Sequence, residues 1–206
     1  MNKKEVYNQT MKTYKNLGDK YLLNIANLVP SQLFDFMDML PSGGAVLDVG
    51  CAGGRDAREF VQEGFGVVGI DLVDDFLNKA EKDVPRAKFL KMDLLNLQFP
   101  KNTFDGIWAS AVLVHIDKTD IQKALTEFNK VLKQDGKLFI AVKMGDGSSF
   151  SSDKLSKEKR FFVYFSREEI EEMLRLAGFQ IKNTFIVEDD AKRKDLNWIR
   201  IIAQKI

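Results

Sequence analysis

The sequence predicts an α/β fold with a largely parallel sheet, preceded by a helical cap at the N-terminus. Two observations lead to this prediction. Short apolar runs of strand length alternate with segments of helical periodicity, which is the pattern of βαβ units. A glycine-rich turn at residues 50–55 directly follows the first apolar run. In such open sheets, ligands bind at the carboxyl ends of the strands.

Composition restricts the class of protein. The chain has 206 residues, 45% of them hydrophobic, which is enough for one domain, residues 1–206, with a stable core. The 31 basic and 30 acidic side chains give a net charge of +1, which argues against a dedicated nucleic-acid binder. No apolar stretch approaches the roughly 20 residues that span a bilayer. The single cysteine, Cys51, permits no intramolecular disulfide and no cysteine-based zinc site, so we expect a cytoplasmic protein.

The chain divides into an N-terminal helical cap, residues 1–40, and a core, residues 41–206. Pro30 and Ser31 indicate a break between two helices of the cap, and residues 41–44 form a Pro-Ser-Gly-Gly turn. The first buried strand follows at residues 45–49. The later elements are expected in this order: helix 56–63, strand 67–70, helix 74–81, strand 87–91, strand 104–109, a helix through 121–132, strand 137–142, a helix ending near Gly178, and strands 179–187 and 198–203.

Two pairs of residues have the spacing of a capping box, in which a Ser or Thr and a Glu or Gln bond to each other's backbone N–H groups. Thr119 and Gln122 form the first pair, before the helix that Gly136 is expected to end. Ser166 and Glu169 form the second. Both pairs predict the start of a helix.

The glycine-rich turn predicts a ligand site. Glycine lets a ligand approach the backbone closely, and the next helix offers free N–H donors. A dinucleotide fingerprint would be G-x-G-x-x-G, and from Gly50 its second and third glycines are replaced by Ala52 and Arg55. Asp48, beside the turn, would repel a pyrophosphate but suits a ligand with an ammonium and a sulfonium, such as S-adenosylmethionine.

Two more carboxylates end neighbouring strands. Asp71 lies 21 residues after Gly50, where a carboxylate can accept hydrogen bonds from both ribose hydroxyls; the alternative is a cap for the next helix. Asp93 can accept a hydrogen bond from an adenine amino group, or it forms an ordinary loop turn. The apolar residues that flank these acids could sandwich an adenine ring or belong to the core: Leu72, Met92 and Leu94.

Several segments together resemble, in order and spacing, the motifs of class I S-adenosylmethionine-dependent methyltransferases of the small-molecule type. The segments are 48–54, 69–72, 91–94, 104–109, 131–138 and 177–181. The resemblance covers roughly residues 40–205. It implies a Rossmann-like, three-layer α/β/α sandwich with a mostly parallel seven-stranded sheet whose last strand is antiparallel. It also implies S-adenosylmethionine as cofactor and S-adenosylhomocysteine as product.

The same resemblance implies roles for single residues. The methionine part of the cofactor is expected beside Asp48, Gly50, Ala52 and Gly54. Asp71 is expected to hold the ribose, with Leu72, Met92, Asp93 and Leu94 around the adenine, and with Ala109 and Ser110 near the transferred methyl group. Ala52 departs from the family, which usually has glycine there.

His115, the only histidine, follows the fourth strand on the cofactor side of the predicted sheet. It could take a proton from an acceptor hydroxyl or amine, or it could pack at the start of the next helix. The segment 145–160, rich in glycine, serine and charge, is expected to be a loop. With the aromatic run 161–165 it could close over a substrate, and Tyr14 and Tyr21 could cover the cofactor; packing is the alternative for both.

The predicted activity is methyl transfer from S-adenosylmethionine to a small-molecule acceptor, by a monomer or homodimer without a metal site and without a membrane or nucleic-acid partner. Three alternatives stay open. They are an RNA or protein methyltransferase, a non-catalytic S-adenosylmethionine-binding module, and an NAD-dependent oxidoreductase, which Asp48, Ala52 and Arg55 disfavour.

Overall fold

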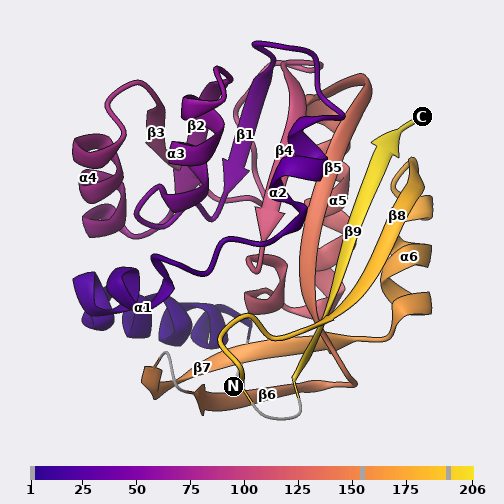
Figure 1. Cartoon of the computed structure of the whole chain (residues 1–206). Helices are drawn as coiled ribbons and strands as arrows, with labels where there is room; N and C mark the ends of the chain where they lie inside the picture. Colours follow the sequence, from indigo (N-terminus) through magenta and orange to yellow (C-terminus); the bar gives the residue numbers. More distant parts are fainter. Residues whose placement is uncertain (1–2, 154–155, 194–195) are drawn as a thin grey trace.

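A sheet of nine strands organises the computed structural model, which describes residues 3–153, 156–193 and 196–206 (Figure 1). The residue range of each strand approximately matches a strand predicted from sequence, except for β6 and β7. The strands are β1 (Ala45–Val49), β2 (Gly66–Asp71), β3 (Lys88–Lys91), β4 (Phe104–Ser110), β5 (Leu132–Met144), β6 (Ser148–Asp153), β7 (Ser156–Phe165), β8 (Phe179–Glu188) and β9 (Asn197–Lys205).

Seven of these strands form the main sheet in the order β3-β2-β1-β4-β5-β9-β8. Strands β1 to β5 pair in parallel, whereas β9 runs antiparallel to both β5 and β8. The predicted sheet of seven strands with an antiparallel last strand is therefore confirmed. The strand order reverses beside β1, so β1 and β4 flank the position where open α/β sheets bind ligands.

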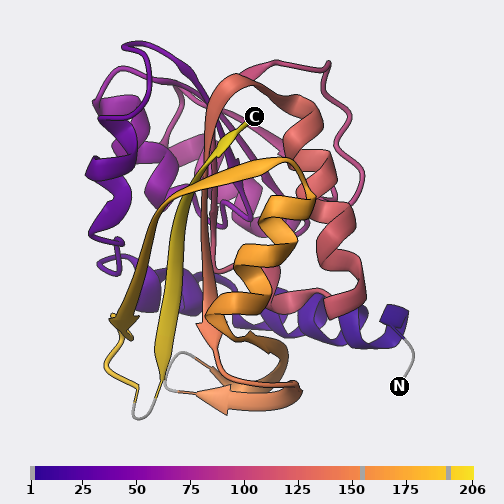
Figure 2. The same ribbon diagram turned by 90° about the vertical axis from the view of Figure 1, so that its right-hand side faces the viewer.

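Helices cover both faces of the main sheet (Figure 2). The chain moves outward from β1 to β3 and then in the opposite direction from β4 to β5, and right-handed crossovers therefore place the intervening helices on opposite faces. Helices α2 (Gln32–Met37), α3 (Arg55–Gln62) and α4 (Asp74–Asp83) lie on one face, and α5 (Ile121–Val131) and α6 (Arg167–Leu176) on the other. Phe36 of α2 and Phe60 of α3 both pack against Trp108 in the buried core.

The first helix, α1 (Lys3–Ile25), lies across the carboxyl ends of β1 and β4 (Figure 1). Gly18, at φ 47°, kinks it. Two fully buried threonines dock it on β7: Thr13 Oγ1 donates to the carbonyl of Lys159 at 3.1 Å, and Thr10 Oγ1 accepts from the N–H of Phe161 at 3.1 Å. Because β7 is joined to the end of β5, this cap is fixed over the ligand-binding edge. In the described part of the chain, no helix is long and apolar enough to cross a membrane.

The expectation of a loop at residues 145–160 holds for 145–147 and is wrong for 148–153 and 156–160, while residues 154–155 lie outside the described residues. Strands β6 and β7 form an antiparallel hairpin, and the end of β7 pairs in parallel with the end of β5 through Lys143 and Tyr164. Alternation of side chains explains why β7 forms a strand. Phe161 and Val163 lie on one face, Arg160 and Phe162 lie on the other, and all four are buried. The serines of β6 gave no such signal because its pairing is made by backbone groups.

The prediction of a capping box formed by Thr119 and Gln122 is also wrong. The Asp117 carboxylate accepts from the N–H of Thr119 at 3.0 Å and from its hydroxyl at 2.6 Å, in a short 3-10 turn, η2 (Lys118–Asp120), that precedes α5. Aspartate is at least as favourable as threonine at the N-cap position. The helix then ends at Val131, so Gly136 lies within β5 instead of ending α5.

The second cap is present. Ser166 Oγ accepts from the N–H of Glu169 at 3.1 Å and opens α6, which ends before Gly178 at φ 82°. The Glu169 carboxylate binds Lys118 at 2.7 Å. The serine cap predicted from sequence is therefore confirmed, while the glutamate serves to join α6 to the turn before α5.

Candidate active site

A pocket of about 190 Å³ lies where β1, β2, β4 and β5 end, under α1. Nine of the twelve cofactor and catalytic residues predicted from sequence line it: Asp48, Gly50, Ala52, Asp71, Leu72, Met92, Leu94, Ser110 and His115. Tyr14 and Tyr21, which were expected to cover the cofactor, line it as well. The nine residues come from four separate stretches of chain. The parallel strands bring them together because their carboxyl ends meet at one edge of the sheet.

Asp48 is a buried carboxyl with unused hydrogen-bonding capacity. Its side chain is 3% exposed, and its Oδ2 has no hydrogen-bond partner among the described residues. Burial raises the pKa of Asp48 well above the usual value, and the nearby carboxylates of Asp56 and Asp71 raise it further, while Arg55 opposes them. A cationic ligand group at this oxygen would relieve the cost of burying the charge.

The turn after β1 is held tightly against β2. The N–H groups of Gly50 and Cys51 both donate to the carbonyl of Ile70, at 2.8 and 3.0 Å. Gly50 has φ 71°, and a Cβ there would lie 2.6 Å from Val112 Cγ2. Glycine is therefore required at this position. Ala52 also has a positive φ, 46°, so the family's usual glycine is replaced by a residue in a strained left-handed conformation.

Asp71 joins two turns. Its Oδ1 accepts from the N–H groups of Leu72 and Val73, at 2.7 and 3.0 Å, and its Oδ2 accepts from Ala52 N–H at 3.0 Å. Burial raises its pKa, and these three hydrogen bonds oppose that rise. A carboxylate oxygen has about two lone-pair sites, so Oδ2 retains room for one further donor. Both readings from sequence are thus compatible, since Asp71 orders the turn before α4 and still faces the pocket.

Three predicted residues lie outside the described pocket lining. Gly54 sits at φ 77° where a Cβ would meet Ala80 and Phe89 at 3.1 and 3.2 Å, so it permits close packing around α3. The Asp93 carboxylate accepts from Leu95 N–H at 2.9 Å, which is the loop turn considered as its alternative. Ala109 is fully buried in the core.

His115 is part of a buried chain of hydrogen bonds. Its Nδ1 lies 2.8 Å from the carbonyl of Phe161, and its Nε2 lies 2.7 Å from the Tyr14 hydroxyl. A carbonyl only accepts, so Nδ1 carries the proton. Arg160 Nη1 donates to the Tyr14 oxygen at 3.0 Å, and an imidazole with its single proton on Nδ1 would accept the Tyr14 proton at Nε2. Burial raises the pKa of Tyr14 well above its usual value, so its hydroxyl is protonated.

Sequence reasoning missed the basic and aromatic residues on the far side of the pocket. Lys143 ends an apolar strand, and Arg200 interrupts another, which were the only local signals. The missed lining residues include Tyr7, Met11, Lys143, Arg160, Asp189, Asp190, Arg193, Trp198 and Arg200, whereas Phe162 belongs to the aromatic run that was expected to close over a substrate.

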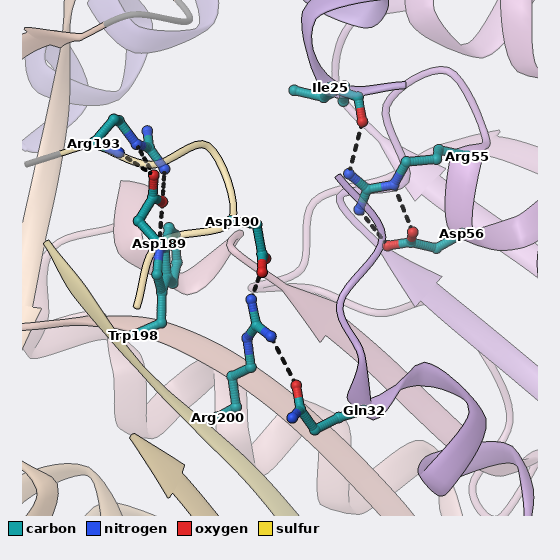
Figure 3. Close-up of polar contacts among 9 residues, drawn as sticks. All are labelled: Ile25, Gln32, Arg55, Asp56, Asp189, Asp190, Arg193, Trp198 and Arg200. Atoms are coloured by element: carbon teal, nitrogen blue, oxygen red, sulfur yellow. Dashed lines mark hydrogen bonds and ion pairs between the residues drawn. The ribbon is translucent and has the colours of Figure 1, made fainter. Parts of the chain in front are cut away.

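Three polar clusters hold the walls of the pocket together (Figure 3). Arg200 binds Gln32 of α2 at 2.8 Å and also binds Asp190. The Asp189 carboxylate accepts from Arg193 and from the Trp198 indole at 2.8 Å; these bonds outweigh burial and lower its pKa to about 2. The third cluster joins the N-terminus of α3 to α1, where Arg55 binds Asp56 at 2.7 Å and the carbonyl of Ile25 at 3.2 Å.

Comparisons of the sequence with known proteins find methyltransferases. Residues 46–136 match the family model described as "Methyltransferase domain". Phosphoethanolamine N-methyltransferase 2 of Caenorhabditis elegans is 34% identical over 153 residues, which are 70% of this chain and 34% of that protein. 2-Methyl-6-phytyl-1,4-hydroquinone methyltransferase of Synechocystis is 36% identical over 110 residues, 51% of this chain and 34% of that protein. The chain therefore spans about a third of the length of these two relatives.

Solved structures share the fold. The 1,6-didemethyltoxoflavin-N1-methyltransferase of Burkholderia thailandensis superposes with a TM-score of 0.81 at 20% identity, covering 100% of this chain and 91% of that one. An S-adenosylmethionine-dependent methyltransferase of Methanosarcina mazei gives a TM-score of 0.75 at 22% identity, covering 86% and 98% of the two chains.

The strand order, the antiparallel β9 and the pocket at the strand ends define the class I methyltransferase fold. Residues 46–136 match the methyltransferase-domain family, and the chain has the fold of S-adenosylmethionine-dependent methyltransferases, in agreement with the resemblance of its motifs.

Proposed function

We propose that this protein transfers a methyl group from S-adenosylmethionine to a small-molecule acceptor. The observation that carries the proposal is the buried Asp48 Oδ2, which lines the pocket and has no hydrogen-bond partner among the described residues. An ammonium group would supply both the missing donors and the opposite charge. The amino acid part of S-adenosylmethionine carries such an ammonium.

The other lining residues fit the rest of this cofactor. Asp71 Oδ2 has room for a ribose hydroxyl beside its bond to Ala52. The half-buried side chains of Leu72 and Met92 and the buried Leu94 offer apolar surface to an adenine ring. The pocket's aspartates Asp48 and Asp71 would disfavour the pyrophosphate of a dinucleotide. When bound, S-adenosylmethionine supplies an electrophilic methyl group on a good leaving group.

The chain's own residues then hold the acceptor and manage its proton. Helix α1 covers the strand ends and excludes water from them. The Tyr14 hydroxyl can take a proton from an acceptor amine or hydroxyl while it passes its own proton to His115 Nε2. His115 would continue to donate its Nδ1–H to the Phe161 carbonyl and would become an imidazolium. Tyr14 would therefore meet the acceptor, and His115 would act through Tyr14.

A small acceptor suits the enclosure of the site. The pocket is lined by buried residues of α1, β5, β7 and β9, including Tyr14, Lys143, Arg160 and Arg200. A residue within a protein or an RNA chain would have to pass between these elements to reach the pocket, which favours a small acceptor. The names of relatives agree: they act on phosphoethanolamine and on a hydroquinone, and the Burkholderia enzyme was crystallised with 1,6-didemethyltoxoflavin and S-adenosylhomocysteine.

Calorimetry with S-adenosylmethionine and S-adenosylhomocysteine tests the proposal, with NADH as control. We expect binding of both sulfur ligands in the micromolar range and none of NADH. Absence of binding by both sulfur ligands would contradict the proposed cofactor. Release of S-adenosylhomocysteine in a screen of metabolites then tests the methyl transfer itself.

We also propose that residues 1–206 act as one domain, with cap 1–40 on core 41–206, in the cytoplasm as a monomer or homodimer. The buried contacts of Thr10 and Thr13 with β7 support the single domain. The buried free thiol of Cys51 fits a reducing compartment. Size-exclusion chromatography with light scattering measures the oligomeric state, and a trimer or larger assembly would contradict this proposal.

A further inference from the structure

We propose that Arg200 selects the methyl acceptor, and that the acceptor presents an uncharged carbonyl oxygen to the Nε–H group of this arginine. The inference rests on the proposed function, because it names the class of acceptor that the same pocket takes. Arg200 is buried in the wall of the pocket, and one of its donors is left for a ligand.

The guanidinium of Arg200 is buried and mostly engaged. Arg200 is 3% exposed and lines the pocket. Its Nη1 donates to Gln32 of α2 at 2.8 Å, and its Nη2 binds the carboxylate of Asp190, as Figure 3 shows. Its Nε has no hydrogen-bond partner among the described residues. A buried N–H group without an acceptor is costly, so a ligand oxygen at this nitrogen would remove that cost.

The two Nη contacts fix the plane of the guanidinium. Gln32 belongs to α2 and is itself buried, whereas Asp190 lies between β8 and β9. Arg200 therefore joins two walls of the pocket and is held from both. A planar donor that is already held in place loses little conformational freedom when it binds a ligand. The Nε–H group is thus prearranged to receive an acceptor atom.

The charge of Arg200 already has a counterion, which decides between a carboxylate and a carbonyl on the ligand. The carboxylate of Asp190 forms an ion pair with Nη2. An anionic ligand at Nε would bring a second negative charge close to Asp190, and like charges repel. A carbonyl oxygen would accept from the N–H group without adding a charge. The site therefore lacks an acceptor atom and has no need of a further negative charge.

Strand register places Arg200 in one row with two small residues of the pocket. Ser110 of β4 is paired with Ala141 of β5, and Ala141 is paired with Arg200 of β9. Residues directly opposite each other in a sheet share a face, and all three of these line the pocket. Because the side chain of Ala141 is only a methyl group, it leaves room for a ligand between Ser110 and Arg200.

The same strand order separates Arg200 from the residues proposed for the cofactor. Strand β9 is three positions from β1, so neighbouring strands about 4.8 Å apart put the backbones of Arg200 and Asp48 about 14 Å apart. Side chains stand roughly perpendicular to a sheet and close little of such a distance. An ammonium group at Asp48 and an oxygen at Arg200 therefore fit two different ligands, the cofactor and the acceptor.

Apolar surface adjoins the arginine. Trp198 lies two residues before Arg200 on β9, so both side chains are on the same face, and both line the pocket. Trp198 donates its indole N–H to the Asp189 carboxylate at 2.8 Å, so this donor is occupied. Trp198 thus contributes apolar surface to the wall. An acceptor with a carbonyl group on a flat or apolar body would suit it.

NMR tests the proposed hydrogen bond directly, because the Nε–H group of a buried arginine gives its own proton–nitrogen signal, which Arg200→Lys identifies by its loss. The probes are benzamide and the cyclic amide pyridone, their analogues with sulfur in place of the carbonyl oxygen, and benzoate. Each is titrated with and without saturating S-adenosylhomocysteine. At least one amide should shift the Arg200 signal and bind about 10-fold tighter than its sulfur analogue and than benzoate.

Three variants test the residues. Arg200→Lys keeps a cation beside Asp190 but removes the Nε–H group, so each amide should bind no more tightly than its sulfur analogue. Asp190→Asn removes the counterion, so benzoate should bind about 10-fold tighter than it does to the unmodified protein. Arg58→Lys is the matched control, since the Arg58 side chain is 45% exposed on α3, outside the pocket lining, and it should change nothing.

All three variants should bind S-adenosylhomocysteine as the unmodified protein does, which also shows that they are folded. Binding of S-adenosylhomocysteine about 10-fold weaker in Arg200→Lys would assign the Nε–H group to the cofactor and overturn the proposal. Preference of the unmodified protein for benzoate, or amides that leave the Arg200 signal unshifted, would also overturn it. Failure of S-adenosylhomocysteine to bind the unmodified protein would instead contradict the proposed function. The probe series without S-adenosylhomocysteine then still tests Arg200, with circular dichroism as the measure of folding.

Discussion

Tyr14 and His115 are joined by a 2.7 Å hydrogen bond although 101 positions separate them in the chain. The bond links α1 to the turn after β4, and it is the middle of a chain that runs from Arg160 through Tyr14 to His115 and the Phe161 carbonyl. Under the proposed function, this buried pair of a tyrosine hydroxyl and an imidazole would exchange protons with the acceptor.

Replacing Tyr14 by Phe removes this proton route while keeping the ring. We expect turnover of methyl transfer to fall by about 100-fold, within the range for general acid–base catalysis, with unchanged affinity for S-adenosylhomocysteine. The measurement is kcat against pH together with calorimetry. Tyr164→Phe is the control, because the Tyr164 hydroxyl bonds only to Ser149 among the described residues, in an exposed contact. Full activity in Tyr14→Phe would show that Tyr14 has only a packing role.

Asp48→Asn should have opposite effects on stability and on cofactor binding. Burial raises the pKa of Asp48 above its unfolded value, so the folded protein binds more protons and loses stability as pH rises from about 4 toward the folded pKa. Asparagine removes that loss, and we expect the free variant to be about 1–3 kcal/mol more stable at pH 7–8, with a smaller difference near pH 4. Thermal melts at several pH values measure this.

The same variant should bind S-adenosylhomocysteine about 10-fold more weakly, because the ammonium loses its carboxylate partner. In the unmodified protein, a protonated Asp48 would release its proton when the ligand binds, so affinity should rise with pH and calorimetry in buffers of different ionisation enthalpy should detect the proton. Binding that is independent of pH and of the substitution would contradict the assignment of Asp48 to the ammonium.

Asp71→Ala should weaken cofactor binding by about 1.5–3 kcal/mol, the range for hydrogen bonds to a charged group. It should also lower the free energy of unfolding by about 1–3 kcal/mol, because three backbone N–H groups lose their acceptor. Asp74→Ala is the control, since Asp74 is 63% exposed and pairs with Lys91 at the surface. A folded Asp71→Ala protein with unchanged cofactor affinity would exclude Asp71 from the ribose site.

Gly50→Ala and Gly64→Ala separate backbone strain from steric overlap. Both glycines have positive φ, 71° and 88°, so each alanine should cost about 1–2 kcal/mol of strain. A Cβ at Gly64 meets nothing within 4 Å, whereas at Gly50 it lies 2.6 Å from Val112 Cγ2. Denaturant unfolding should therefore show a cost for Gly50→Ala about 1–3 kcal/mol larger than for Gly64→Ala. Equal costs would mean that Val112 moves aside freely.

The sequence by itself determined the main sheet and the side of the pocket that Asp48 and Asp71 line. Apolar runs fix the buried strands locally, and residues at the ends of parallel strands, such as Asp48 and Asp71, must meet at one edge. Local patterns misled where a second residue or a distant strand competes. Asp117 forms the cap in place of Thr119, and residues 148–153 and 156–160, without an apolar run, pair as strands.

The tertiary structure alone decided the other side of the pocket. Lys143, Arg160 and Arg200 are isolated cations along the chain, and only the adjacency of β7, β5 and β9 puts them on one surface. Tyr14 meets His115 where α1 docks on the rest of the fold, in part through the bonds of Thr10 and Thr13 to β7. Strand order and helix docking depend on contacts between residues far apart in sequence, and local propensity and periodicity carry no information about such contacts.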